Sequence, residues 1–175
     1  MDKFTDSLLY VLPALVVAGG IFLLVRRFLD NEYRLRLLES RRTMLKDMLP
    51  LRLQAYERIC LLLERISPGS LLNRVYSPGM NVRAFQSELL SQIRAEFEHN
   101  MVQQIYLSPA AWELVRNAKE DIIRIINLAA AQAGEEASGS DLSRAVYDIM
   151  IKTESMPAQK ALDFVKQEVR QLFMQ

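Results

Sequence analysis

The only histidine of the chain follows a glutamate by three residues, in the segment EFEHN. Glu96 and His99 form a Glu-x-x-His pair, which is half of the ligand set of a di-iron site in a helical bundle. Such a site needs two of these pairs and two further glutamates, and the chain has no second histidine. Glu96 and His99 are therefore only weak metal-ligand candidates. We predict no metal and no cofactor, and we expect His99 to be a polar or half-buried helix residue.

Cys60 is the single cysteine, so it cannot form an internal disulfide. It lies on an apolar stripe among leucines, where a thiol is a small hydrophobic group with a raised pKa and low reactivity. One histidine gives no readable Ser-His-Asp arrangement, and the sequence lacks Gly-x-Ser-x-Gly, P-loop and dinucleotide-binding glycine patterns. We therefore predict no catalytic residue and no enzymatic activity.

The amino-acid composition indicates the class of fold in which these residues lie. Leu, Ala, Glu, Arg, Gln and Met dominate, while Gly and Pro lie between periodic segments. The formal net charge is only +1, and the later segments balance acids with bases, which does not suit a phosphate-binding groove. The sequence predicts an all-α chain with no nucleic-acid partner. We expect an N-terminal transmembrane helix followed by a cytoplasmic bundle of four or five helices.

The stretch from Ser7 to Val25 contains no charged residue. As a helix it would extend about 28 Å, close to the hydrocarbon thickness of a bilayer. Pro13 permits a kink without forbidding a spanning helix, and Gly19 and Gly20 permit close approach of another helix. A cleaved signal peptide is the main alternative, but MDKFTD is acidic and the apolar run ends in two arginines. We predict a permanent anchor over residues 1–28.

The basic residues give the anchor a direction. Only Lys3 precedes the apolar run, whereas many basic residues follow it: Arg26, Arg27, Arg34, Arg36, Arg41 and Arg42. Positive residues stay on the cytoplasmic side, so we expect a periplasmic N-terminus and a cytoplasmic remainder at a bacterial inner membrane. Residues 29–49 then form a basic connecting helix beside the lipid headgroups, with the lipid bilayer as a partner.

The bundle is predicted over residues 50–175. Pro50 suits the first turn of a new helix, with Asp47 as a possible cap. An a/d stripe follows, which fits either an intermolecular coiled coil or an intramolecular bundle. Its members are Leu49, Leu53, Tyr56, Cys60 and Leu63. Two Ser-Pro-Gly turn signals flank SLLNRVY, which is either a packed helical turn or a surface loop.

Three further boundaries are readable. A helix is expected over Val82–Tyr106, with an apolar face formed by Val82, Phe85, Leu89, Ile93, Phe97, Met101 and Ile105. Ser108 and Pro109 mark the start of the next helix, which carries an outward Glu120–Arg124 pair and ends at Gly134. Two shorter helices follow, from Asp141 to about Glu154 and over Pro157–Phe173.

The block EFEHNMVQQIYLSPAAWELVRNAKEDIIRIINLAAA, Glu96–Ala131, resembles a family of small, uncharacterised single-pass membrane proteins of Bacteroidota. The order of the anchor, PLRLQAYERICLLLERI, this block and KALDFVKQEVRQLF is also similar to that family. The resemblance covers most of the chain. It implies the same anchored helical layout, and it implies no activity and no catalytic residue.

These patterns favour a non-catalytic adaptor or accessory subunit that docks a helical module at the inner face of a bacterial membrane. Its partners would be subunits of a membrane complex or a second copy of itself. Tyr106, Leu107, Trp112 and SLLNRVYSPGM are contact candidates if they are exposed, and the alternative is that they fill the core. A bundle that binds a lipid or a metal is the second hypothesis. An enzyme of unrecognised type is the third.

Overall fold

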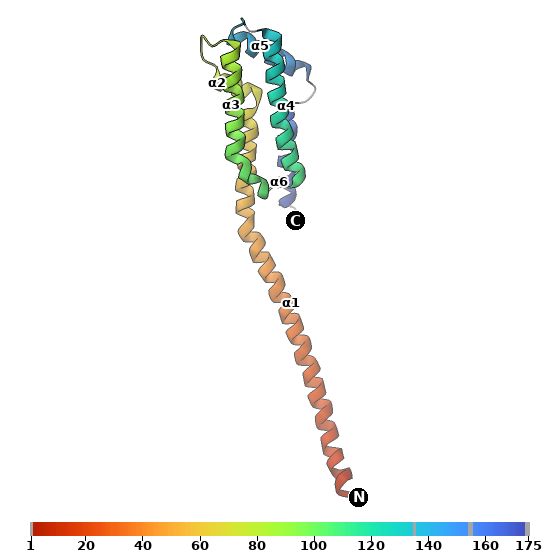
Figure 1. The fold of residues 1–175 in the computed structure, drawn as a ribbon. Helices are drawn as coiled ribbons and strands as arrows, with labels where there is room; N and C mark the ends of the chain where they lie inside the picture. Colours follow the sequence, from red (N-terminus) through yellow and green to blue (C-terminus); the bar gives the residue numbers. More distant parts are fainter. Residues whose placement is uncertain (1, 135, 154–155, 174–175) are drawn as a thin grey trace. The chain divides into compact units, whose positions relative to one another are not determined.

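The structure is a computed structural model that describes residues 2–134, 136–153 and 156–173, without the side chains of residues 2–15, Arg41 and Leu45. All regular elements in these residues are helices, apart from one isolated bridge between Asn81 and Ser138 (Figure 1). They are α1 (Asp2–Ile66), α2 (Pro68–Val75), α3 (Val82–Asn100), the 3-10 helix η1 (Met101–Ile105), α4 (Pro109–Ala133), α5 (Gly139–Lys152) and α6 (Pro157–Leu172). The predicted all-α class is confirmed.

The chain divides into two compact units, Met1–Leu49 and Pro50–Gln175, which are called unit 1 and unit 2 below. The described part of unit 1 is helical throughout and belongs to α1, while the last turns of α1 belong to unit 2. No break in α1 separates residues 2–28 from residues 29–49. The predicted division of this region into an anchor and a connecting helix stays a prediction.

Pro50 does not start a new helix, and Asp47 is not a cap, because α1 runs through both positions. A proline inside a helix lacks the N–H that would bond the carbonyl four residues earlier, here that of Lys46. Lys46 and Pro50 are both exposed, so water can satisfy this carbonyl. The helical propensity on either side then carries α1 past the proline.

Unit 1 exposes large apolar side chains. Between 50% and 69% of each of the following is accessible to solvent: Val16, Val17, Ile21, Phe22, Leu23, Leu24, Val25, Phe28 and Leu29. Within the described residues, no helix has an apolar stretch long enough to cross a membrane. The side chains of Ser7 and Pro13 lie outside the described residues, whereas Gly19, Gly20 and Val25 lie within them. A spanning helix over Ser7–Val25 stays a prediction.

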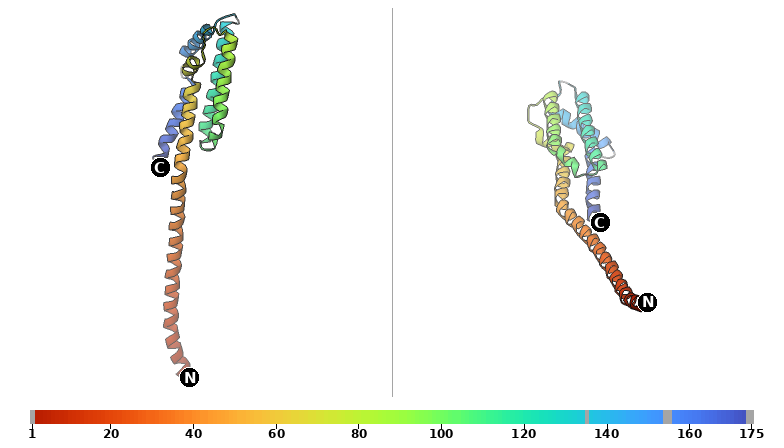
Figure 2. Two further views of the ribbon diagram at one scale, coloured as in Figure 1. Left: turned by 90° about the vertical axis from the view of Figure 1, so that its left-hand side faces the viewer. Right: turned by 60° about the horizontal axis from the view of Figure 1, so that its bottom comes forward.

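Unit 2 has a closed hydrophobic core. α4 packs against α3, α5 and α6, and the ribbon seen from two further sides shows these helices as a bundle (Figure 2). The largest fully buried side chains are Tyr56, Ile59, Leu62, Leu63 and Ile66 of α1, Leu71 of α2, Phe85, Leu89 and Ile93 of α3, Ile122 and Ile126 of α4, and Leu142 of α5. Of the predicted stripe on α1, Tyr56 and Leu63 are buried, whereas Leu49, Leu53 and Cys60 are only half-buried, with Cys60 packed against the core.

The predicted start and end of α4 are confirmed. The Ser108 hydroxyl accepts a hydrogen bond from the Ala111 N–H at 3.1 Å, and Pro109 occupies the first turn. Gly134 ends the helix with φ of 87°, a conformation that favours glycine. α5 begins slightly before the predicted Asp141, because Ser138 and Asp141 form a capping box around Gly139.

The predicted helix Val82–Tyr106 is too long. α3 ends at Asn100, and the next five residues form η1. A 3-10 helix advances about 120° per residue instead of 100°, so the apolar face of α3 does not continue into η1. As a result, Met101 and Ile105 are exposed to 41% and 68%, whereas the earlier members of the face are buried.

Two smaller expectations also need correction. Glu120 forms its close ion pair with Lys119, and Arg124 forms one with Asp121. The hydrogen bond from Lys119 lowers the pKa of Glu120 and the charge of Arg124 adds to this effect, so the predicted Glu120–Arg124 pair is present only as a longer-range attraction. The two Ser-Pro-Gly segments differ: Gly79 has φ of 87° in a turn, whereas Pro68 and Gly69 begin α2. SLLNRVY is therefore a packed helical segment, with Leu71 and Leu72 buried.

Candidate functional site

Glu96 on α3 is held by two arginines from other helices. Arg65 of α1 donates to Glu96 Oε1 through Nε and Nη2, and Arg74 of α2 donates to the same oxygen from Nη1 at 3.4 Å. Arg74 Nη2 also donates to the Arg65 carbonyl at 3.3 Å. The Glu96 side chain is only 16% exposed. This cluster, which we call the Glu96 cluster, ties α1, α2 and α3 together.

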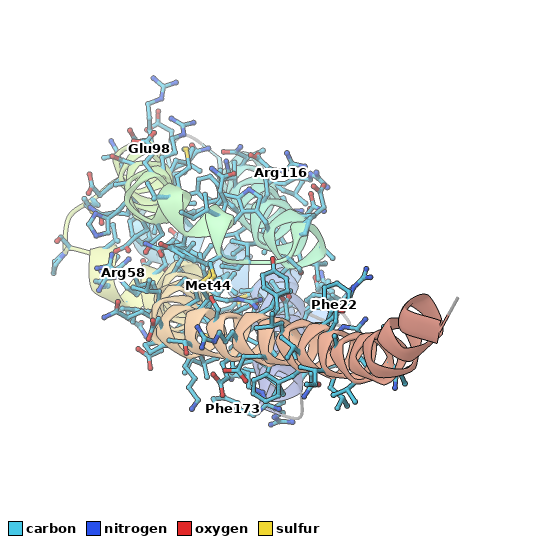
Figure 3. The ribbon with its side chains drawn as sticks, turned by 90° about the horizontal axis from the view of Figure 1, so that it is seen from below. Phe22, Met44, Arg58, Glu98, Arg116 and Phe173 are labelled. Atoms are coloured by element: carbon cyan, nitrogen blue, oxygen red, sulfur yellow. The ribbon has the colours of Figure 1, made fainter. Side chains whose placement is uncertain are left out.

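His99 is exposed one turn beyond Glu96 and lines an open cleft of about 600 Å³ with it. Arg58, Leu61, Arg65 and Asn100 are among the other lining residues. Arg58 projects outward from α1 in a view of the side chains from below (Figure 3). Asn100 is buried, and its amide donates to the Glu96 carbonyl at 2.9 Å.

The structure does not assemble the weak metal-ligand pair into a metal site within the described residues, which hold no group of three or more His, Cys, Asp or Glu side chains suited to a metal. The carboxylate of Glu96 faces two guanidinium groups, and their positive charges oppose binding of a cation there. His99 therefore lies in an open cleft beside the carboxylate of Glu96, which is bound by two arginines.

A second polar cluster, the Glu168 cluster, was not expected from the sequence. The Tyr56 hydroxyl of α1 donates to Glu168 Oε1 of α6 at 2.5 Å, and Arg52 Nη2 donates to the Tyr56 oxygen at 3.3 Å. At the start of α4, the Ser108 N–H donates to Glu168 Oε1 at 3.1 Å and the Ser108 hydroxyl donates to Glu168 Oε2 at 2.7 Å. One carboxylate thus joins three helices.

Burial and the bond to Glu168 raise the pKa of Tyr56 to about 12, because both disfavour the phenolate. Tyr56 therefore remains a protonated donor at neutral pH. Tyr56 and Glu168 are separated by 112 residues in the chain, so no local pattern relates them. The only usable signal was Ser108, whose capping role was predicted but whose hydroxyl bond to α6 was not.

Cys60 is half-buried beside the core of unit 2. Burial raises the pKa of its thiol, and the positive charge of Lys166 offsets this only in part. The sequence-based expectation of a raised pKa is confirmed, and the thiol is accordingly a poor nucleophile at neutral pH.

The predicted contact residues mostly pack against the core. Leu107 is buried, and Tyr106 and Trp112 are half-buried beside the core. The Trp112 ring stacks on Phe97 with centroids 5.3 Å apart, and Lys119 Nζ lies 4.4 Å from the Phe97 ring centroid on α3. In the SLLNRVYSPGM segment, Tyr76 is 41% exposed and meets Phe85 edge to face.

An exposed apolar surface lies next to these residues, on η1. Val102 and Ile105 are 66% and 68% exposed, and Met101 is 41% exposed. We call Met101, Val102 and Ile105 the η1 surface. The sequence did not indicate it, because the helical period assigned Met101 and Ile105 to the core. The signal that could have indicated it is the position of these three apolar residues directly before the predicted helix start at Ser108 and Pro109.

Comparison with protein-family models gives one match, to a family of unknown function, DUF7935, over residues 2–172. No curated protein and no solved structure matches the chain. The family match carries no statement about a Bacteroidota origin or about a membrane. It extends through both units and nearly the whole chain, so this protein belongs to the DUF7935 family.

Proposed function

We propose that this protein is a non-catalytic, membrane-anchored adaptor or accessory subunit that holds a helical module at the inner face of a bacterial membrane. The observation that carries the proposal is the contrast between the two units. Unit 1 exposes a long series of large apolar side chains, whereas unit 2 buries most of its own in a core and exposes the rest at scattered positions such as Val102, Ile105 and Ile151. Exposed apolar surface of this extent favours a lipid or protein environment over water.

The anchor would be the uncharged run Ser7–Val25. Its support is the sequence, together with the exposure of Val16–Val25, which is the described part of the run. Insertion of such a run is favourable because most of its residues are Leu, Val, Ile or Phe. Arg26 and Arg27 follow directly, and the positive-inside rule then puts unit 2 in the cytoplasm.

The non-catalytic character is supported by the state of the polar and reactive side chains in unit 2. Glu96 is bound by two arginines, Glu168 by Tyr56 and Ser108, and the thiol of Cys60 has a raised pKa. General acid–base catalysis and nucleophilic catalysis need groups whose pKa values lie near the working pH or are lowered. The clusters of this protein instead connect helices to one another.

The docking face of the adaptor would be the η1 surface. Three apolar side chains lie exposed on a short 3-10 helix that is fixed at both ends, by α3 before it and by the capped start of α4 after it. A rigid apolar projection of this kind suits the pocket of a protein partner, because little conformational entropy is lost on binding. The proposed partner is a protein subunit of a membrane complex.

Site-specific photo-crosslinking of the full chain in its native membranes tests this proposal. A photoreactive amino acid is placed at Val102 or Ile105, and at Leu128 as the control, because Leu128 is an equally apolar and 50% exposed residue of α4. We expect the same protein to be captured from positions 102 and 105 and not from position 128. Capture of no protein at 102 and 105, or of the same proteins at all three positions, would overturn the η1 assignment.

Ligand binding is a second candidate, favoured by the open cleft of about 600 Å³ beside the Glu96 cluster. Its lining combines the apolar, 59% exposed Leu61 with Arg58 and Arg65, a mixture that suits a lipid with an anionic headgroup. Native mass spectrometry of the detergent-purified protein distinguishes the two functions. A stoichiometric lipid that is lost in Arg58→Ala would favour this candidate, and a lipid-free protein would exclude it.

A further inference from the structure

The exposed part of α1 in unit 1 contains a heptad pattern. In unit 2, the buried residues Tyr56, Ile59, Leu63 and Ile66 alternate at spacings of three and four along the chain. Counting back in sevens from these positions gives the d position Arg52 in unit 2, and in unit 1 the a positions Phe28, Leu35, Arg42 and Leu49 and the d positions Asn31, Leu38 and Leu45. Most of the seven residues in unit 1 are apolar. The heptad positions that are buried in unit 2 are therefore mostly apolar in unit 1 as well, with the charged Arg52 between the two stretches.

The apolar seam residues between positions 28 and 38 are exposed to solvent. Phe28, Leu35 and Leu38 are accessible to 67%, 49% and 55%. Leu45 enters by its place in the sequence alone. A seam with spacings of three and four is the pattern of a helix that pairs with another helix.

We propose that residues 28–49 pair with the same segment of a second copy of this chain, as a parallel, in-register, two-stranded coiled coil. The flanking charges identify both the partner and its direction. In this frame, Arg27 and Arg34 occupy g positions, and Glu32 and Glu39 occupy e positions. In a parallel dimer each g residue faces the e residue five positions later in the partner, which pairs Arg27 with Glu32 and Arg34 with Glu39.

An antiparallel dimer would oppose these charges. Residues at g would face g, and residues at e would face e, so arginines would meet arginines and glutamates would meet glutamates or Lys46. The parallel arrangement leaves one unfavourable g–e pair, Arg41 with Lys46, at the end nearer unit 2. Two favourable pairs on each side of the seam outweigh it.

The polar seam residues are compatible with two strands. A single asparagine in a coiled-coil seam fixes register and oligomeric state at some cost in stability, and Asn31 would do this here. Arg42 is exposed, and its aliphatic stem can cover the seam while its guanidinium group reaches water. Within the chain, Glu32 already accepts from Arg36 through Oε1 at 3.2 Å, an exposed pair that leaves the second carboxylate oxygen for Arg27 of the other copy.

Cysteine crosslinking of the full chain in native membranes tests the seam. Cys60 is first replaced by serine, and single cysteines are introduced as Leu35→Cys and Leu38→Cys. The controls are Tyr33→Cys and Arg36→Cys at f and b, which are at least as exposed as the seam positions and would crosslink at least as readily by random collision. Mild oxidation should convert the seam variants to disulfide-linked dimers and leave the controls mainly monomeric. Equal crosslinking at all four positions, or none at 35 and 38, would overturn the proposal.

Charge reversal tests the direction of the pairing. Arg34→Glu or Glu39→Arg alone should weaken dimerisation about tenfold or more, measured by sedimentation in detergent, and the double variant should restore it. Single reversals without effect, or a double variant weaker than either single one, would contradict a parallel dimer. The inference does not depend on the anchor: a crosslink at position 35 in a protein washed from the membrane would refute the proposed anchoring and leave the dimer standing.

Discussion

α1 uses the same residue types in opposite ways in the two units. In unit 2, Ile59 and Leu62 are completely buried, whereas in unit 1 Leu24 and Leu38 are 69% and 55% exposed. Burying such a side chain is worth about 1.5–3 kcal/mol, so the exposed residues of unit 1 leave a comparable free energy unused at each position. Apolar periodicity thus identifies a helix face that is stabilised by burial against another surface. It does not say whether that other surface belongs to the same chain, to lipid or to another copy of the protein.

The first and largest test of this contrast is a pair of truncations. Ile59→Ala should lower the free energy of unfolding of unit 2 by about 2–5 kcal/mol, because it leaves a cavity in a closed core. Leu38→Ala should change it by less than about 0.5 kcal/mol. Trp112 is the only tryptophan and stacks on Phe97, so its fluorescence during urea denaturation reports on unit 2. If the two variants lowered the free energy of unfolding of unit 2 equally, the distinction between the units would be wrong.

Next in size is Ser108→Ala. The hydroxyl of Ser108 caps α4 and also donates to Glu168 Oε2, so its loss should cost about 1–2 kcal/mol in the same denaturation experiment. Thr43→Ala is the control in unit 1, where the hydroxyl donates to the Glu39 carbonyl on an exposed helix surface. We expect no measurable change in the unfolding of unit 2 in that variant. A Ser108→Ala protein as stable as the unsubstituted chain would show that the Glu168 cluster contributes little.

A smaller effect is expected from neutralising Glu96. Glu96→Gln keeps the shape of the side chain but removes the charge that Arg65 and Arg74 share, and it should destabilise unit 2 by about 1 kcal/mol. Glu32→Gln removes a comparable charge from an exposed pair in unit 1, and its effect on unit 2 should be within error. If the two variants behaved alike, the Glu96 cluster would be an ordinary surface pair.

The smallest effect at neutral pH is expected from Tyr56→Phe, about 1 kcal/mol or less, and its size should depend on pH. The pKa of Tyr56 rises from 10.0 to about 12 on folding, so the protonated side chain contributes stability that is complete below pH 10. This contribution is lost as the pH rises from 10 to 12. The difference in stability between the two proteins should shrink over that interval in pH-dependent urea denaturation, and a difference that stayed constant would contradict the raised pKa.

Local signals in the sequence were enough for the elements that local chemistry determines. Ser108, Pro109 and Gly134 gave the limits of α4, and the spacing of Phe85, Leu89 and Ile93 gave the inner face of α3. The same rules failed where the backbone departed from the expected period. η1 changes the rotation per residue, which exposes Met101 and Ile105, and α1 passes Pro50 because the freed carbonyl lies in water.

The polar clusters depended on contacts that no local pattern encodes. Glu96 was singled out for its spacing to His99, but its partners Arg65 and Arg74 precede it by 31 and 22 residues. Glu168 is one of two acids in α6, and its bonds to Tyr56 and Ser108 arise only when three helices meet. The sequence analysis named Glu96, Tyr56 and Ser108 for other reasons, and it identified neither their partners nor the pairings.

The most direct test of the account is the extraction behaviour of the full chain compared with a variant that lacks residues 7–25. Membranes containing each protein are washed with alkaline carbonate, and the pellet and supernatant are assayed for the protein. The account predicts that the full chain stays in the pellet, whereas the shortened chain appears in the supernatant with the unfolding midpoint of unit 2 unchanged. Release of the full chain into the supernatant would contradict the proposed anchor.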